Sequence, residues 1–388
     1  MVRGAARYRG RHARSSVTED MIKSPAFLKI EEEIKKAYGA HVFRPLQKTD
    51  ARLLPTGFFA LDYCLGGGLP VNRIVEIVGH KGCFKTTLVL KIIASYQRRC
   101  GLCLHLLDCC PCGKREQDNM VIYLDAEHAL DEEHALRHGI NADPDRFRLL
   151  RPPSGEMACE YAESLIMVPE VAIMVIDTLA DLVPETEMQK GYFDPFSRNL
   201  RARLIARLSR QMTHKVDRPD RPRFLIFVNH LLPNQASAYG GDTSPGGEEQ
   251  AYASSTIIKL WARQPKRFMF NKAAKSAEDA EDAEAEAEPQ KKREINFLLT
   301  HHKSRPQAAG AFDLAVEEEP GLTYGDAHDF DAVFNWALKG GLIGVNGKSQ
   351  WAYDGQMFKA QKHIKDLWKS DAVKYEQVKT AIIAAKAH

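Results

Sequence analysis

The 388-residue sequence contains no apolar run approaching the roughly 20 residues of a membrane-spanning helix, which excludes a transmembrane protein. The first sixteen residues are basic and lack the apolar stretch that a secretory signal needs. No internal repeat is visible. The composition, 44% hydrophobic and 27% charged, is an ordinary balance for a soluble chain that buries a sizeable core. The length predicts one large domain with attachments, or two domains.

Charge of one sign is missing from each of two segments. Residues 1–14 contain five arginines and no acid, whereas residues 278–288 contain seven acids and no base. The formal net charge of +3 therefore hides a net charge of +10 on the chain outside the acidic segment. Because few apolar residues accompany these charges, we interpret residues 1–16 as a disordered arm and the acidic segment as part of an exposed insert.

Short apolar runs alternate with helical patterns from about residue 52 onward. Four runs rich in Val and Ile predict buried strands, at residues 73–79, 120–125, 171–177 and 223–229. Helical patterns follow the first three, at residues 86–99, 131–139 and 196–212. This alternation indicates an α/β fold with a mostly parallel sheet covered on both faces. Later runs instead predict antiparallel strands at a sheet edge, at residues 255–263, 267–270 and 293–303.

Changes in composition divide the chain into four parts. After the arm at 1–16, residues 17–51 contain an N-terminal helix at 27–39 and a linker. The α/β core spans residues 52–324 and includes a cysteine-rich insert at 100–119 and the acidic insert at 272–292. Residues 325–388 predict a small C-terminal unit with both helices and strands.

A glycine-containing loop joins the strand at 73–79 to the helix after it. Its sequence is Gly79-His80-Lys81-Gly82-Cys83-Phe84-Lys85-Thr86-Thr87. Because backbone N–H groups at a helix N-terminus bind phosphates, the loop predicts an ATP site. Lys85 would reach the β- and γ-phosphates, and Thr86 would offer its hydroxyl to Mg²⁺. Phe84 stands where the pattern G-x-x-x-x-G-K-[ST] has its second glycine, and a turn without a ligand is the alternative.

Three polar residues follow other strands of the predicted sheet. Asp177 ends the strand at 171–177, and Glu127 and His230 come just after two others. The carboxyl ends of parallel strands meet at one edge, so we expect these residues to converge with Lys85. Asp177 would contact Mg²⁺ through water, Glu127 would polarise the water that attacks the γ-phosphate, and His230 would contact that phosphate. The alternatives are helix capping by Glu127 and a structural role for His230.

Several segments in a fixed order resemble the RecA-type recombinases. They are LPTGFFALDYCLGGGLPVNRIVEIVG at 54–79, YLDAEHALD at 123–131, VIDTLADLVPETE at 175–187, PGGEEQAYAS at 245–254 and QWAYDG at 350–355. The resemblance covers roughly residues 27–368 and implies a RecA-like ATPase core. Phe84, His230 and the segment Lys303-Ser304-Arg305 resemble the phage recombinases of the UvsX kind more than cellular RecA.

The resemblance implies an ATP-dependent DNA recombinase that forms filaments on single-stranded DNA and catalyses homologous pairing and strand exchange. The implied partners are single- and double-stranded DNA, further copies of the chain docked through the helix at 27–39, a single-strand-binding protein and a loading mediator. Such a protein is cytoplasmic, in a bacterial host if it is encoded by a phage. Two alternatives remain: a hexameric helicase on the same core, and a non-catalytic paralogue that acts as a mediator.

Further roles follow from the resemblance. His134 stands where the family stacks a tyrosine on adenine, and Lys303 where the family reaches ATP bound by a neighbouring subunit. His301 replaces a second such lysine. Residues 189–197 and 231–247 correspond to the two DNA-binding loops.

DNA contacts are expected from these loops and from the helix after the first of them. Tyr239 or Tyr192 could wedge or stack between bases, and Gly246 and Gly247 lie where the second loop ends. Arg203 and Arg210 align with phosphate-contacting arginines of the family, although some of the five arginines on this helix only solvate it. The arm at 1–14 either adds non-specific attraction to phosphates or has no role. The acidic insert would mimic DNA, recruit a basic partner or serve as a solvated loop.

Five of the eight cysteines lie within residues 100–112. The recombinases have only a short turn at this place, so the segment is an insertion, and a cytosolic ATPase argues against disulfides. C-x₂-C followed by C-C-P-C supplies enough thiolates for a tetrahedral Zn²⁺. We choose Cys100, Cys103, Cys109 and Cys112 as ligands, with Cys110 or His105 as substitutes. Thiols without a metal are the alternative.

Overall fold

The computed structural model describes residues 24–39, 52–113, 120–189, 197–217, 222–233, 242–243, 249–262, 292–302, 308–315, 329–346 and 350–386. Contacts divide the chain into two units, residues 1–50 and residues 51–388. In the first unit, helix α1 (Pro25–Tyr38) begins at Ser24, whose hydroxyl accepts a hydrogen bond from Phe27 N. Every helix in the described parts of the chain is too short or too polar to cross a membrane.

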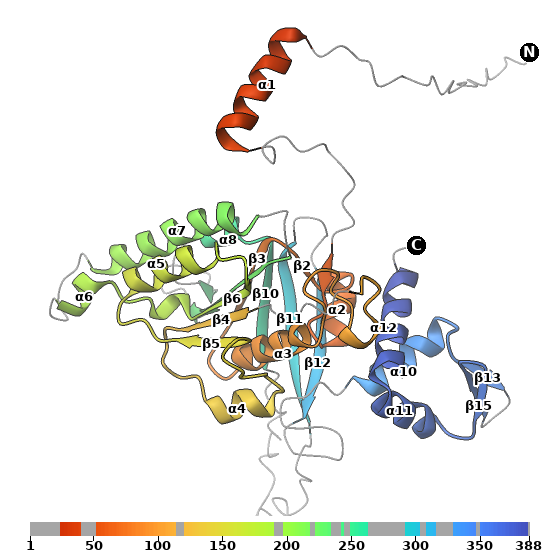
Figure 1. The fold of residues 1–388 in the computed structure, drawn as a ribbon. Helices are drawn as coiled ribbons and strands as arrows, with labels where there is room; N and C mark the ends of the chain where they lie inside the picture. The colour runs from red at the N-terminus through yellow and green to blue at the C-terminus, as the bar shows by residue number, and fades with distance from the viewer. Residues whose placement is uncertain are drawn as a thin grey trace, which may run out of the picture. The chain divides into compact units, whose positions relative to one another are not determined.

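A central eight-stranded sheet organises the second unit (Figure 1). Its strand order is β12-β11-β10-β3-β7-β6-β4-β5. The strands are β3 (Arg73–Gly79), β4 (Met120–Asp125), β5 (Phe147–Leu150), β6 (Val171–Asp177), β7 (Phe224–His230), β10 (Thr256–Ala262), β11 (Lys292–His302) and β12 (Ala308–Ala315). All neighbours from β10 to β5 are parallel, which confirms the predicted α/β class with a mostly parallel sheet.

One strand prediction was partly wrong. Residues 255–263 were expected to form an antiparallel strand at a sheet edge, but β10 lies inside the sheet between β3 and β11. It pairs parallel with β3, with Ile258 opposite Ile77, and antiparallel only with β11. The chain between β7 and β10 includes helix α8 (Glu249–Ala253) and is long enough for the crossover that parallel pairing requires. β11 is antiparallel to both of its neighbours, as expected for the segment at 293–303. The segment predicted at 267–270 lies outside the described residues.

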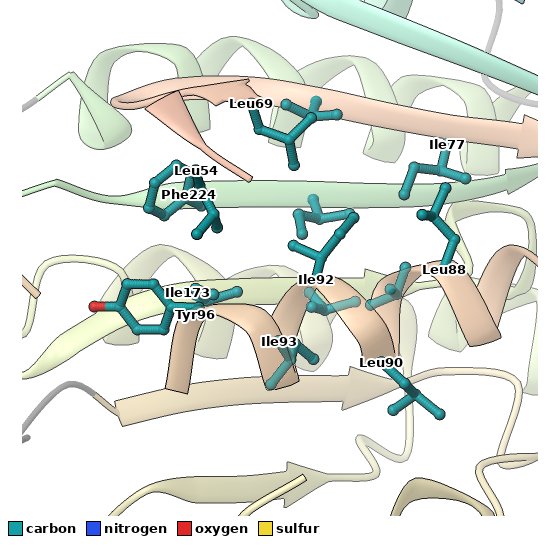
Figure 2. Packing of buried hydrophobic residues seen from close by; sticks show 14 of the residues in the cluster. Leu54, Leu69, Ile77, Leu88, Leu90, Ile92, Ile93, Tyr96, Ile173 and Phe224 are labelled. Carbon is teal, nitrogen blue, oxygen red and sulfur yellow. The ribbon is translucent and has the colours of Figure 1, made fainter. Parts of the chain in front are cut away.

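Two apolar layers flank this sheet because alternate residues of each strand point to opposite faces. Helix α3 (Lys85–Gln97) covers one face, where it packs on Ile77, Ile173 and Phe224 (Figure 2). Eleven of its thirteen residues are buried, which explains why its apolar residues occupy most of its faces. Helices α5 (Gly155–Leu165) and α7 (Ser197–Val216) cover the opposite face (Figure 1).

Shorter elements complete the core. They are β1 (Leu53–Leu54) paired with β2 (Leu69–Pro70), α2 (Phe59–Leu65), α4 (Glu132–Arg137), α6 (Glu185–Gln189), β8 (Leu232–Pro233) paired with β9 (Asp242–Thr243), and the 3₁₀ turns η2 (Leu107–Cys109) and η3 (Leu179–Asp181).

The C-terminal part has an apolar cluster of its own. It consists of α10 (Phe330–Lys339), the antiparallel strands β13 (Gly344–Asn346), β14 (Gln350–Tyr353) and β15 (Gln356–Phe358), α11 (Gln361–Ser370) and α12 (Ala372–Lys386). Trp368 is fully buried here and contacts the rings of Phe334, Tyr353 and Tyr375. Phe59 of α2 belongs to the same cluster, and its N–H donates to Asp329 Oδ2 at 2.7 Å. Helix α2 therefore joins the C-terminal part to the core.

A second connection runs through Glu376 on α12. Its carboxylate oxygens lie 3.1 Å from Arg99 Nη2 and 2.8 Å from Lys379 Nζ. Burial alone would raise the pKa of Glu376, but the charges of Lys379 and Arg99 outweigh burial and lower the pKa to about 2. Since Arg99 lies two residues beyond the end of α3, this ion cluster ties the end of α3 to α12.

We expect Glu376→Gln to lower the free energy of unfolding by about 2 kcal/mol at pH 7, because two buried cations lose their counter-charge. A carboxylate with a depressed folded-state pKa stabilises the fold above its ordinary pKa of 4.5 and loses this contribution as the pH falls toward 2. The difference between wild type and variant in denaturant unfolding should therefore shrink from pH 7 to pH 3. Glu160→Gln, at an exposed position of α5, is the matched control. Equal effects of both substitutions, or a difference independent of pH, would contradict the assignment.

Candidate functional site

The carboxyl ends of β3, β4, β6 and β7 border a cleft of about 340 Å³. Its lining residues are Lys81, Gly82, Cys83, Phe84, Lys85, Thr86, Thr87, Glu127, Asp177 and His230. Residues far apart in the sequence meet here because parallel strands deliver their carboxyl ends to one edge of the sheet. The structure thus brings Lys85, Glu127, Asp177 and His230 together.

The loop between β3 and α3 closes one side of the cleft. Gly79 ends β3 where a Cβ atom would lie 2.7 Å from the carbonyl oxygen of Leu260 on β10, so a side chain does not fit. Gly82 has a φ of +75°, and Phe84 has a φ of +62°, in the left-handed region. A glycine adopts this conformation at little cost, whereas phenylalanine needs compensation of about 1 kcal/mol. Packing of the Phe84 ring against the core beneath α3 supplies apolar burial that offsets this cost.

Lys85 is the first residue of α3 and is buried at the base of the loop. Its Nζ atom donates to the carbonyl oxygens of Gly79, at 3.0 Å, and His80, at 3.1 Å. Burial lowers the pKa of Lys85, against the opposing effect of nearby Asp177 and Glu127. An anion in the cleft would stabilise the charged ammonium, so this lysine is suited to a phosphate group.

Asp177 lies at the buried end of β6 and receives two hydroxyl hydrogen bonds. Thr86 Oγ1 donates to its Oδ2 at 3.1 Å, and Tyr123 OH donates to the same atom at 2.5 Å. Burial raises the pKa of Asp177 to about 6, although both hydroxyls oppose the shift. Its buried Oδ1 atom accepts no hydrogen bond from the described residues. A carboxylate oxygen with an unused lone pair beside a threonine hydroxyl is a donor set that fits Mg²⁺, directly or through water.

Glu127 is exposed at the mouth of the cleft, just beyond β4. Its N–H and that of Ala126 both donate to the carbonyl oxygen of Asp177, which fixes the end of β4 beside the end of β6. Helix capping, the alternative role for Glu127, belongs to other residues. Asp125 accepts from the N–H groups of Ala129 and Leu130, and Asp131 caps α4. The Glu127 carboxylate is therefore available to the cleft.

His230 ends β7, the strand between β3 and β6, and also lines the cleft. Its Nε2 atom lies 3.9 Å from Glu127 Oε2 and 3.8 Å from Asp181 Oδ2. Burial, followed by the charge of Lys85, lowers its pKa, so the imidazole is mostly neutral at pH 7. Sequence reasoning missed Asp181 and Tyr123. Asp181 follows Asp177 by four residues, a weak signal, whereas Tyr123 looks like an ordinary apolar strand residue in the sequence.

A buried polar network lies beneath the cleft, between β3, β7 and α8. Glu76 Oε1 accepts from Asn229 Nδ2 at 3.3 Å and from Gln250 Nε2 at 3.1 Å. Burial raises the pKa of Glu76 to about 7. Because Asn229 precedes His230 and Gln250 lies on the helix after residues 234–248, Glu76 connects the floor of the cleft to the end of that segment.

Some predicted residues lie elsewhere or cannot be placed. His134 is not among the residues that line the cleft; its ring meets His138 edge-on, with centroids 4.3 Å apart. Lys303, Tyr192, Tyr239, Gly246 and Gly247 lie outside the described residues, as does the side chain of His301.

The arginines of helix α7 lie on different faces of the helix and have different surroundings. Arg203, Arg207 and Arg210 are exposed and follow one another at helical spacing along one side. Arg201 instead donates to the carbonyl oxygen of Ala180 at 2.9 Å and to Glu187 at 2.7 Å. Arg201 therefore anchors the helix, whereas the exposed arginines form a positive stripe.

Four cysteines of the predicted zinc insert lie together. The ligand atoms of Cys100, Cys103, Cys110 and Cys112 are all within 4.8 Å of one another. Cys110, named as a substitute in the sequence prediction, is in the group, whereas the side chain of Cys109 lies outside the described residues. His105 is exposed, and its Nδ1 atom lies 3.2 Å from the carbonyl oxygen of Cys103.

The sequence of this chain is similar to one protein family and to several known proteins. The family described as "RecA N-terminal domain" matches residues 26–279. "Protein RecA" of Tropheryma whipplei (strain Twist) is 36% identical over 216 residues, which are 55% of this chain and 44% of the relative. "Protein RecA" of Aquifex pyrophilus is 32% identical over 63% of this chain and 65% of the relative. "Protein RecA" of Syntrophus aciditrophicus (strain SB) is 30% identical over 69% of this chain and 71% of the relative.

The chain spans less than two thirds of the length of the first two of these relatives. The matched family region nevertheless covers well over half of the chain and contains every described residue of the cleft. The family match and the sequence similarity show that this chain belongs to the RecA family.

Proposed function

We propose that the chain is an ATP-dependent DNA recombinase that forms filaments on single-stranded DNA and catalyses homologous pairing and strand exchange in recombination and repair. The observation that carries this proposal is the convergence of Lys85, Thr86, Glu127 and Asp177 on one cleft of a RecA-family core. These residues supply a cation for phosphates, a donor set for Mg²⁺ and a carboxylate for an attacking water.

In the proposed reaction, ATP is hydrolysed to ADP and phosphate. The backbone of residues 79–86 and the Lys85 ammonium hold the β- and γ-phosphates. Thr86 and Asp177 would hold Mg²⁺, which supplies charge neutralisation on the phosphate oxygens. Glu127 orients the attacking water and accepts its proton at a carboxylate oxygen. His134 on adenine and Lys303 on ATP of a neighbouring subunit remain part of the proposal through family resemblance alone.

His230 is the proposed sensor of the γ-phosphate. Its ring already faces Glu127 and Asp181 in the cleft, and β7 continues from it into the second predicted DNA loop. The Glu76 network reaches the far end of that loop through Gln250. A phosphate that draws the imidazole toward itself would thus act on the loop from both of its ends, which couples ATP to DNA binding.

The exposed arginines of α7 are the proposed phosphate contacts. Arg203 and Arg210 lie two turns apart, so both can face one nucleic-acid backbone. Tyr239 or Tyr192 would stack between bases, and Gly246 and Gly247 would offer backbone amides. The chain contains no visible motif that reads base edges, which agrees with sequence-independent binding.

The type of recombinase, its cellular location and its protein partners are also proposed. Phe84, His230 and the segment at 303–305 favour a recombinase of the phage UvsX kind, acting in the cytoplasm of a bacterial host. A single-strand-binding protein and a loading mediator are the proposed partners. The roles proposed above for the cleft residues do not involve Zn²⁺ at the cysteine cluster.

Electron microscopy of the full chain with single-stranded DNA and a slowly hydrolysed ATP analogue tests the proposed assembly. Helical filaments are expected. Closed rings would instead favour a hexameric helicase on the same core, and isolated particles a non-catalytic mediator.

We expect Glu127→Gln to lower the DNA-stimulated ATPase rate by about 10²- to 10⁴-fold, because the amide cannot accept the proton of the attacking water. Binding of ATP and of single-stranded DNA should stay near wild-type level, since Glu127 is exposed and supports no helix cap. Glu132→Gln, at an exposed position of α4 outside the cleft, is the control and should keep full activity. Full ATPase activity of Glu127→Gln would remove Glu127 as the base.

We expect the double substitution Arg203→Ala with Arg210→Ala to weaken binding of all single-stranded sequences alike. If each arginine neutralises one phosphate, the slope of log affinity against log salt should become shallower by about 0.7 per arginine. Fluorescence anisotropy of labelled oligonucleotides over a salt series measures this slope. Arg148→Ala, an exposed position of β5, should leave the slope unchanged, and an unchanged slope in the double variant would contradict the proposal.

A further inference from the structure

The cysteine insert gathers four sulfur atoms at the end of α3 that faces away from the phosphate loop. Cys100 Sγ lies 3.5 Å from Cys112 Sγ, and Cys103 Sγ lies 3.5 Å from Cys110 Sγ. The two pairs also approach each other, with 3.0 Å between the sulfurs of Cys110 and Cys112 and 3.7 Å between those of Cys103 and Cys112. The sulfurs therefore form one compact group rather than two separate pairs.

Backbone hydrogen bonds hold this arrangement in place. Arg99 and Leu106 form an isolated antiparallel bridge, and Cys100 N–H donates to the carbonyl oxygen of His105 at 2.8 Å. Leu104 N–H turns back to the carbonyl oxygen of Cys100, also at 2.8 Å. This tight turn directs Cys100 and Cys103 to the same side. The 3₁₀ turn η2 then reverses the chain and returns Cys110 and Cys112 to them.

The four sulfurs are close enough together to share one tetrahedral metal ion. Zn–S bonds of about 2.3 Å at tetrahedral angles place sulfur atoms about 3.8 Å apart. The four separations given above, from 3.0 to 3.7 Å, lie somewhat below this distance, so one ion could contact all four sulfurs after a small outward shift. Two disulfides would bring sulfurs together in pairs, to about 2.05 Å, and would give no reason for all four to be neighbours. The insert is also short and partly exposed, so it has little apolar core to hold its shape.

We propose that Cys100, Cys103, Cys110 and Cys112 bind one Zn²⁺ as four thiolates in a structural site. Cys110 takes the place that the sequence prediction gave to Cys109. With four protein ligands the site has no open position for a substrate, so its role is to hold the insert together.

The zinc-bound insert would brace the C-terminal part of the protein. Arg52 Nη1 donates to the carbonyl oxygen of Leu102 at 2.6 Å, and Arg99 Nη1 donates to that of Leu104 at 3.3 Å. Arg99 in turn holds Glu376 of α12. Residues 103–106 form part of the wall of a cavity of about 1120 Å³ that α12 also lines. The metal would fix the wall of this cavity and the Leu104 carbonyl group that orients Arg99.

Metal analysis of the purified full-length chain tests the site directly. We expect about one zinc per chain in the wild type. Cys103→Ser, Cys110→Ser and Cys112→Ser should each lose most of the zinc, because each removes one thiolate ligand. The variants should still fold, since these positions are not fully buried and their substitution opens no core cavity. Cys109→Ser and Cys64→Ser should retain the zinc. Loss of zinc in Cys109→Ser with retention in Cys110→Ser would overturn the ligand set.

Two measurements on the unaltered protein make the outcome independent of variant folding. Co²⁺ in place of zinc should show the absorption of a tetrahedral thiolate site. Zinc should also protect the exposed Cys112 from alkylation until a strong chelator removes the metal. A metal-free protein with Cys112 freely alkylated, or with the cluster cysteines joined in disulfides, would overturn the proposal. Neither measurement involves ATP or DNA, so failure here is distinguishable from failure of the recombinase proposal.

Discussion

The buried carboxylate of Asp177 is the constraint around which the cleft is arranged. It stands at the end of a strand whose residues are all buried, where a lone negative charge is unfavourable, and its pKa rises accordingly. Thr86 from α3 and Tyr123 from β4 stabilise the charge with hydroxyl hydrogen bonds. Strand β6, the neighbouring strand and the helix after the phosphate loop are thereby held in one geometry. A cation bound beside Asp177 would stabilise this carboxylate further, and it would do so in the position where phosphate oxygens need neutralisation.

The same strand end also sets the position of the Glu127 carboxylate. The carbonyl oxygen of Asp177 accepts both the Ala126 and Glu127 N–H groups, so the chain beyond β4 cannot move without breaking bonds to β6. Asp125 takes over the capping of the following residues, which leaves Glu127 pointing to solvent and to His230. Asp177 ends β6 and is buried, whereas Glu127 lies two residues beyond the end of β4 and is exposed. The roles proposed for them, metal binding for Asp177 and proton acceptance for Glu127, rest on this difference.

The sequence predicts β3, β4, β6 and β7 to within one residue, because each is a run of mostly apolar, buried residues. It misses β5, which is short, is only partly buried and contains Arg148. It predicts β10 less well: this segment was expected at a sheet edge, but it lies between β3 and β11, and its composition does not reveal that one neighbour is parallel and the other antiparallel. The convergence of Lys85, Glu127, Asp177 and His230 was predictable from topology alone. Tyr123 and Asp181 were missed because their roles depend on side-chain direction. The choice between Cys109 and Cys110 likewise depended on how η2 turns, which the spacing of adjacent cysteines does not reveal.

Helix α3 runs from the cleft at one end to the cysteine cluster at the other. Its first residue is Lys85, in the cleft, and its last turn leads through Arg99 into the cysteine cluster and to Glu376 of α12. Thirteen residues of helix span about 20 Å, and the helix is buried along nearly its whole length, so it acts as a rigid rod through the core. A disturbance of the insert can therefore reach the phosphate loop only by shifting the whole helix against the sheet, which tight packing of Ile77, Ile173 and Phe224 resists. Changes at the cysteines should thus act on the attachment of the C-terminal part far more than on the chemistry of ATP.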